Sequence, residues 1–165
     1  MFCRKKACLV AVSCLVLFCL AWLLSSQLQA SNGIETTDLC EQINEIGETL
    51  RPFPYVWGGF SKEQGGFDCS GFVYRTHKML GRPVPRTTSR KYYLMTQTEE
   101  KHWSEAECGD WVWWTLQSHR PFGHIGIHVE QPVIWHSGSS MGVSTIEMFR
   151  GGYWDRHFEV SKGVQ

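Results

Sequence analysis

Apolar positions in the first half of the chain recur with the spacing of α-helices. The first stripe consists of Leu39, Ile43, Ile46 and Leu50, which share one helical face. A second apolar face lies within residues 70–80, and Gly81 suits the position that follows a helix end. A third helix is expected to begin at a cap formed by Thr87 or Thr88 and to run through Leu94.

In the second half, short runs of β-branched and aromatic residues replace the helical spacing. These runs are residues 110–115, 124–130, 133–137 and 143–149, with a last strand expected at 157–160. Gly, Pro and Ser separate them, as is typical of strands joined by tight turns. Helices followed by strands predict an α+β fold in which N-terminal helices pack on a C-terminal antiparallel sheet.

A strongly apolar segment precedes all of these elements. Residues 7–24 are almost wholly apolar, three basic residues stand before them, and no acidic residue occurs before Glu35. This pattern predicts an export signal with a cleavage position near Ala30. The length also allows a retained membrane anchor. The sequence AVSC at residues 11–14 is similar to the lipid-attachment box of bacterial lipoproteins. All three alternatives export the domain.

The seven cysteines divide by position. Cys3, Cys8, Cys14 and Cys19 lie in the export segment, and Cys40, Cys69 and Cys108 remain. An odd number leaves at least one thiol without an intramolecular partner. Cys40 and Cys108 could form a disulfide or stay as two buried thiols, and the sequence permits both.

Cys69 stands just before the second predicted helix, in the stretch GGFDCSG. Free backbone N–H groups and the helix dipole favour a thiolate at such a position. The glycines at 65, 66 and 71 let backbone or substrate approach closely. A cysteine placed in this way becomes a nucleophile only if a base can reach it.

His124 is the best candidate for that base, because it opens a predicted strand. Strand alternation places His124, Gly126 and His128 on one face and leaves the aliphatic residues between them for the core. A hairpin turning at residues 130–132 would pair residue 126 with His136. His124 would then be one diagonal step from His136 on the same face, whereas a one-residue shift would separate them.

These three side chains predict acyl-transfer chemistry. Cys69 would attack a carbonyl as a thiolate, and His124 would take its proton and later protonate the leaving amine. His136 would orient the His124 ring, and the backbone N–H of Cys69 would help to hold the oxyanion. Such a pair predicts a bell-shaped pH profile. A Cys/His₂ zinc site is the alternative, but spacings of 55 and 12 residues lack a short paired-ligand signature, so we expect no metal.

Read in order, the motifs resemble a known family. The segments PYVWGG, GFDCSGFV, PVPRTTS, GDWVWW, GHIGIHV, VIWHS and GYW are similar to those of the NlpC family of papain-like bacterial cell-wall cysteine peptidases. The resemblance runs from about Pro54 to Trp154. It implies a papain-like α+β fold and hydrolysis of peptidoglycan stem peptides, usually at the bond that joins γ-D-glutamyl to a diamino acid.

The resemblance also implies roles for individual residues. Cys69, His124 and His136 match the nucleophile, the base and the polar third member. Tyr55 matches a tyrosine that assists the oxyanion, and Arg86 matches an arginine with a structural role. Asp68 and Ser70 match positions that contact the free amine of the substrate in several relatives.

Two departures from the family pattern concern the groove. His128 stands where relatives often carry Tyr, and Trp113 and Trp114 replace smaller residues. Both could reshape the groove. His128 and the other four histidines besides His124 and His136 are expected to be structural or solvated.

The chain therefore divides into three predicted parts: residues 1–30 as an export signal or membrane anchor, 31–53 as a linker and N-terminal helix, and 54–165 as a catalytic papain-like domain. We expect a monomeric, cofactor-free enzyme in the periplasm or cell envelope, with membrane attachment through the N-terminal segment as one alternative. The formal net charge of zero gives no argument for nucleic-acid binding. An amidase, a transpeptidase or a non-catalytic murein-binding module remains the alternative function.

Overall fold

The computed structural model describes residues 38–164 of the 165-residue chain. The predicted export signal, anchor or lipoprotein segment lies outside the described residues. Within residues 38–164, no helix is both long enough and apolar enough to cross a membrane.

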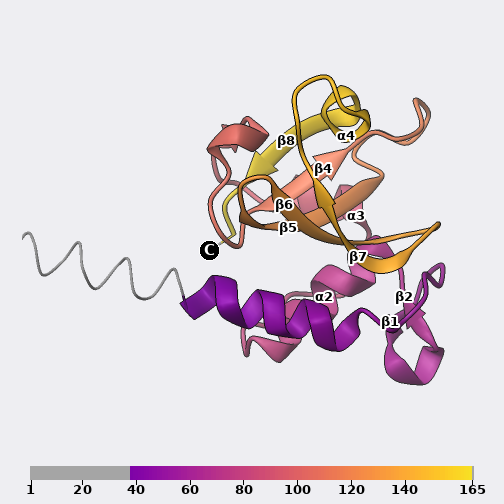
Figure 1. Ribbon diagram of the computed structural model, residues 1–165. Coiled ribbons are helices and arrows are strands. Elements are labelled where there is room, and N and C mark those ends of the chain that lie inside the picture. Colours follow the sequence, from indigo (N-terminus) through magenta and orange to yellow (C-terminus); the bar gives the residue numbers. More distant parts are fainter. Residues whose placement is uncertain (1–37, 165) are drawn as a thin grey trace, which may run out of the picture. The chain divides into compact units, whose positions relative to one another are not determined.

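A six-stranded antiparallel sheet forms the centre of the fold (Figure 1). Its strands, in spatial order, are β3 (Glu100–Lys101), β8 (Phe158–Lys162), β4 (Trp111–Trp114), β5 (His124–Glu130), β6 (Val133–Gly138) and β7 (Gly142–Glu147). Strands β4 to β7 follow one another as hairpins, and β8 returns to pair with β4. This is the antiparallel sheet that the alternating runs of the second half predict.

Helices come mainly from the first half of the chain. A helix over residues 38–50 is followed by α2 (Cys69–Met79) and α3 (Ser89–Met95). Short elements join them: β1 (Phe60–Ser61), η1 (Lys62–Gln64), β2 (Gly66–Phe67) and, later, η2 (Trp103–Glu105) and α4 (Tyr153–His157). Thr88 caps α3 by accepting a hydrogen bond from the Lys91 N–H, and Gly81 adopts positive φ after α2, as the sequence predicts.

The two faces of the sheet bury different side chains. Ile125, Ile127 and Val129 of β5 pack with the helices in the larger core, together with Trp113 and Trp135. The opposite face carries a smaller cluster built on Val112, Trp114, Ile134, Ile146 and Met148. Trp154 of α4 packs against this second cluster, so α4 covers the face opposite to the large helices. His124 and His136 lie on the side of this second cluster.

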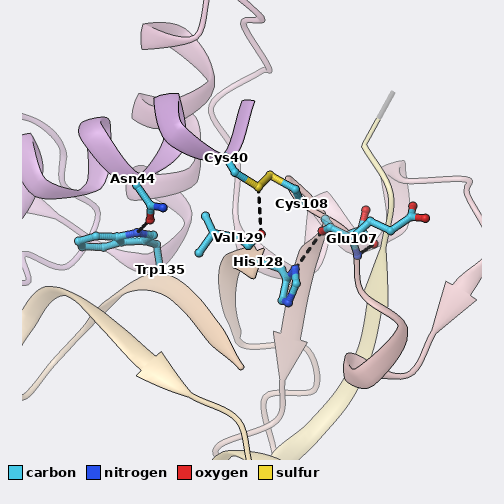
Figure 2. Close-up of a disulfide and its surroundings, with 8 residues drawn as sticks. Cys40, Asn44, Glu107, Cys108, His128, Val129 and Trp135 are labelled. Atoms are coloured by element: carbon cyan, nitrogen blue, oxygen red, sulfur yellow. Dashed lines mark hydrogen bonds between the residues drawn. A yellow bond between two sulfur atoms is a disulfide. The ribbon is translucent and has the colours of Figure 1, made fainter. Parts of the chain in front are cut away.

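The N-terminal helix is fixed to the sheet by its apolar stripe. Ile43 and Leu50 are almost fully buried, as their spacing predicts. Gly47 lies so close to Trp135 that a Cβ there would fall 2.5 Å from the indole, so only glycine fits. The Trp135 indole N–H also donates to the Asn44 side-chain oxygen at 2.8 Å (Figure 2).

A disulfide provides the second attachment of this helix. Cys40 on the helix is bonded to Cys108 in the loop before β4, across 68 residues of sequence (Figure 2). This result decides between the two alternatives that the sequence leaves open. Cys69 is consequently the one free cysteine of residues 38–164.

The β5–β6 hairpin has the predicted register. Gly126 pairs with His136, although Glu130 belongs to β5 and an irregularity lies between His128 and Glu130. Some features differ from the expectation, and strands β1, β2 and β3 are among them, because two residues cannot display an alternating pattern. Helix α4 was not predicted, because five residues cannot display helical periodicity. The last strand also begins at Phe158 rather than His157, because His157 ends that helix.

Candidate active site

Cys69 is the first residue of α2, and the local sequence explains this position. Asp68 is extended and caps the helix, because its carboxylate accepts a hydrogen bond from the Gly71 N–H at 2.6 Å. Gly71 has to be glycine, since a Cβ there would lie 1.9 Å from the Gly59 carbonyl oxygen. Residues 58–59 therefore pack directly over the first turn of α2 and bring the neighbouring loop to the candidate nucleophile.

Asp68 and Ser70, the proposed substrate contacts, are engaged within the protein. The Asp68 carboxylate accepts hydrogen bonds from Ser70 Oγ at 2.8 Å, from the Gly71 N–H and from the Gly58 N–H at 3.0 Å. It also forms an ion pair with Arg86 at 2.9 Å. Arg86 donates a second bond to Ser70 Oγ at 2.9 Å. Each carboxylate oxygen thus accepts two hydrogen bonds, which fills the acceptor positions of the group.

His124 and His136 are in direct contact, as the predicted hairpin register requires. His124 Nε2 lies 2.8 Å from His136 Nδ1, and both side chains are buried. His136 Nε2 lies 3.4 Å from the hydroxyl of Ser144, which is paired with His136 across β6 and β7. If His124 donates to His136 and His136 donates to Ser144, Nδ1 of His124 is left as the basic nitrogen. The sequence reasoning missed Ser144, although strand parity opposite His136 could have identified it.

Aromatic rings cover the histidine pair. The Trp154 ring is stacked on His124 with a centroid distance of 5.7 Å and meets His136 edge-on at 5.1 Å. Trp114 lies behind His124, also at 5.7 Å. These ring contacts fix the orientation of both imidazole rings. Trp154 occurs in the GYW segment, but the sequence reasoning gave it no role in the site.

The sulfur of Cys69 lies beside the backbone that leads into His124. Sγ is 3.9 Å from the carbonyl oxygen of Gly123, and the N–H groups of Ile125 and Ser70 also act on it. The structure therefore brings the predicted nucleophile to the start of β5, where the predicted base is located. Cys69 is only 7% exposed.

This burial controls the charges of the resting site. It raises the pKa of the Cys69 thiol to about 12, and the Asp68 carboxylate adds to the effect. Burial also lowers the pKa of His124 to about 4 and that of His136 to about 3. The expectation of an acidic thiol at the helix N-terminus is therefore wrong for this site, because lost solvation outweighs the helix position. The resting pair is a thiol beside a neutral imidazole.

Tyr55 lies near Cys69, in the loop before β1. It forms a bridge with Phe67, two residues before the nucleophile. Burial raises the pKa of Tyr55 to about 12, and the nearby Cys69 and Asp68 contribute in the same direction, so its hydroxyl stays protonated. A protonated phenol near the sulfur can donate a hydrogen bond to a developing oxyanion.

A cleft of about 500 Å³ gives access to these groups. Its walls include Tyr55, Trp57, Arg120, His124, His136 and Trp154. Cys69 does not line the cleft itself; Gly123, whose carbonyl oxygen is near Sγ, does. Among residues 38–164, no group of three or more His, Cys, Asp or Glu side chains is arranged to hold a metal ion.

His128, which departs from the family pattern, lies away from this cleft. It is buried, and its Nδ1 is 3.1 Å from the Glu107 carbonyl oxygen, next to the disulfide (Figure 2). Trp113 is in the larger core and donates its indole N–H to the Ser89 carbonyl oxygen at 3.1 Å. Of the residues expected to reshape the groove, Trp114 alone contacts a catalytic candidate.

Known proteins share sequence with this chain. The chain is 30% identical over 140 residues to the murein DD-endopeptidase MepH of Escherichia coli (strain K12), which covers 84% of this chain and 48% of MepH. It is 34% identical over 106 residues to the bifunctional muramidase/DL-endopeptidase CwlT of Bacillus subtilis (strain 168), which covers 63% of this chain and 30% of CwlT. The chain thus spans less than half the length of either relative.

The fold has solved counterparts. A lipoprotein-like NLP/P60 protein from Staphylococcus aureus subsp. aureus Mu50 superposes with a TM-score of 0.62 at 26% identity, over 76% of this chain and 41% of that one. The predicted papain-like α+β fold is confirmed. The NlpC/P60 family matches residues 52–162, which contain every candidate site residue. The chain therefore belongs to the NlpC/P60 family.

Proposed function

We propose that this chain is an exported cysteine endopeptidase that hydrolyses peptidoglycan stem peptides. The observation that carries the proposal is the 2.8 Å contact between His124 and His136, together with the 3.9 Å distance between the Cys69 sulfur and the carbonyl oxygen of Gly123, the residue before His124. The names of MepH and CwlT support peptidoglycan as the substrate. The disulfide supports export, because such bonds persist in oxidising compartments.

The proposed reaction begins with proton transfer inside the buried pair. The Cys69 thiol gives its proton to Nδ1 of His124 as sulfur attacks the scissile carbonyl carbon, so the site creates the thiolate without losing a proton to water. The imidazolium that forms is stabilised by donation from Nε2 to His136, which in turn donates to Ser144. The hydrogen bonds among His124, His136 and Ser144 orient the His124 ring and do not carry protons along the series.

The oxyanion of the tetrahedral intermediate needs donors in place before the attack. As the first residue of α2, Cys69 has a backbone N–H with no acceptor inside the helix. The Tyr55 hydroxyl supplies a second donor. Collapse of the intermediate breaks the C–N bond, His124 protonates the leaving amine, and the acyl group remains on sulfur as a thioester. Water activated by His124 then hydrolyses this thioester and restores the thiol.

The scissile bond is proposed to join γ-D-glutamyl to a diamino acid. The relatives differ on this point, since MepH is called a DD-endopeptidase and CwlT a DL-endopeptidase. A digest of defined muropeptides by the chain, followed by mass spectrometry, tests the assignment. Products ending in γ-D-glutamate are expected. Cleavage at a cross-link alone would reassign the bond, and a product joined to an added amine would identify a transpeptidase.

The family resemblance also implies that Asp68 and Ser70 contact a free amine of the substrate. Because both side chains are already held by Arg86 and by backbone N–H groups, an amine could bind Asp68 only by displacing one of these partners. We therefore propose that their first function is to fix the start of α2 and the loop at Gly58. A comparison of KM for peptides with free and with acetylated amines separates the two roles.

A further inference from the structure

The charge of the catalytic cleft comes from one side chain. Among the described residues that line the cleft, Arg120 is the only Lys or Arg, and none is Asp or Glu. The two histidines in the cleft are neutral near pH 7, because burial lowers their pKa values to about 4 and about 3. The cleft is therefore positive, and it would attract an anionic group of a ligand.

The guanidinium of Arg120 lacks an internal anion. Within residues 38–164, no carboxylate forms an ion pair with it, and no acceptor receives a hydrogen bond from it. Its contact is with Trp57, whose ring lies 5.1 Å from the guanidinium carbon. Stacking on an aromatic face leaves the N–H groups at the edge of the guanidinium available, and this edge matches a planar carboxylate.

Trp57 is unusual for its exposure. It is 74% exposed, although it lines the cleft beside buried catalytic candidates. The loop that carries it is nevertheless fixed, because the adjacent Gly58 donates its N–H to Asp68 and its carbonyl oxygen accepts from Arg86 at 3.4 Å. An indole held open to solvent on a fixed loop is available to hold a cationic side chain in place.

The loop that carries Arg120 is also held in one conformation. Phe122 has a φ of 54°, which a non-glycine residue rarely adopts. Three contacts fix it: its N–H donates to Thr115 Oγ1 at 3.0 Å, its carbonyl oxygen accepts from Ser89 Oγ at 2.7 Å, and its ring stacks on Tyr93 at 3.8 Å. Strain retained by surrounding contacts is common where a loop places a functional side chain.

Arg120 is close to the reacting groups. Gly123 follows it by three residues and places its carbonyl oxygen 3.9 Å from the Cys69 sulfur. Tyr55 lines the same cleft, and both Cys69 and Arg120 act electrostatically on its hydroxyl. A group bound at Arg120 would thus lie beside the bond that Cys69 attacks.

We propose that Arg120 binds a free carboxylate of the stem peptide next to the scissile bond, and that Trp57 holds the guanidinium in position. This inference rests on the proposed function and adds the feature that selects the substrate. A glutamyl residue linked through its γ-carboxyl keeps its α-carboxylate free, and a diamino acid that is joined through an amine and ends the stem peptide keeps its own. Either group is planar and can receive two parallel N–H bonds from Arg120.

The test measures binding in a Cys69→Ala background, so that it does not depend on cleavage. Titration calorimetry compares a stem peptide with two derivatives, in which either the glutamyl α-carboxylate or the diamino acid carboxylate is converted to a carboxamide. The same three peptides are titrated into Arg120→Gln, Arg120→Lys and the control Arg90→Gln. Arg90 is an exposed arginine of α3 that does not line the cleft, so its removal changes the net charge equally.

One of the two amides is expected to bind at least about tenfold more weakly than the acid, and the affected amide identifies the carboxylate. Arg120→Gln should abolish this preference, Arg120→Lys should retain part of it, and Arg90→Gln should leave it intact. The inference is overturned if both amides bind as well as the acid, if Arg120→Gln keeps the preference, or if no peptide binds. The proposed function has a separate failure, namely that the wild-type chain cleaves none of these peptides.

Discussion

Removal of the Cys40–Cys108 disulfide should destabilise the domain strongly. The bond closes 68 residues of chain that contain α2 and α3. The loop-entropy relation assigns about 4 kcal/mol to a loop of this size. With an unfolding entropy of about 2.1 cal/mol/K per residue, a domain of about 125 residues should lose roughly 15 °C in Tm. The double variant Cys40→Ala/Cys108→Ala is therefore expected to fold but to melt far earlier.

The assay is thermal unfolding followed by circular dichroism in a Cys69→Ala background, which removes the free thiol. Reduction of the disulfide-bonded protein should reproduce the Tm of the double alanine variant, because both lack the same cross-link. Reductant should leave the double variant unchanged, which controls for other effects of the reagent. A Tm difference below about 3 °C between the oxidised and reduced protein would refute the reasoning, because the apolar stripe alone would then hold the helix.

Three further outcomes are expected. The bell-shaped pH profile should be wide, because burial lowers the pKa of His124 to about 4 and raises that of Cys69 to about 12. The value of kcat/KM should stay level from pH 8 to 5 and halve near pH 4. A fall in kcat/KM with a midpoint near pH 6.5 would contradict this. Asp68→Asn should lower the free energy of unfolding by about 2–3 kcal/mol in denaturant titrations, because it breaks the pair with Arg86. Its KM should change equally for peptides with free and acetylated amines, and a selective rise for the free amine would instead assign Asp68 to substrate reading. Ser144→Ala should lower kcat about tenfold with little change in KM. The control Thr145→Ala, on the opposite strand face, should leave kcat unchanged. An equal change in kcat for the two variants would exclude a positioning role for Ser144.

The parts of the site that the sequence predicts are those governed by strand parity. His124 and His136 come together because a short hairpin has few possible registers, and the alternation of apolar residues in β5 selects one of them. The N-terminal helix was predictable for a similar reason, since its apolar stripe needs only the helical period. These features depend on neighbours that are close in sequence.

The features that the sequence does not predict depend on distant neighbours. The Asp68 carboxylate accepts a hydrogen bond from Arg86, which is 18 residues away, so the two groups meet only when the chain is folded. The raised pKa of Cys69 results from burial by several elements, which no local motif encodes. Trp154 lies on a helix of five residues and Arg120 in an irregular loop, so neither is marked by periodicity.

The central claim is that the thiol of Cys69 cleaves stem peptides with His124 as its base. The most direct measurement is kcat/KM for a defined stem peptide with the wild-type chain, Cys69→Ala and His124→Ala, with folding of each checked by circular dichroism. Wild type should cleave the peptide, and each variant should lose at least about a thousandfold in kcat/KM. Equal cleavage by the wild type and Cys69→Ala would contradict the account.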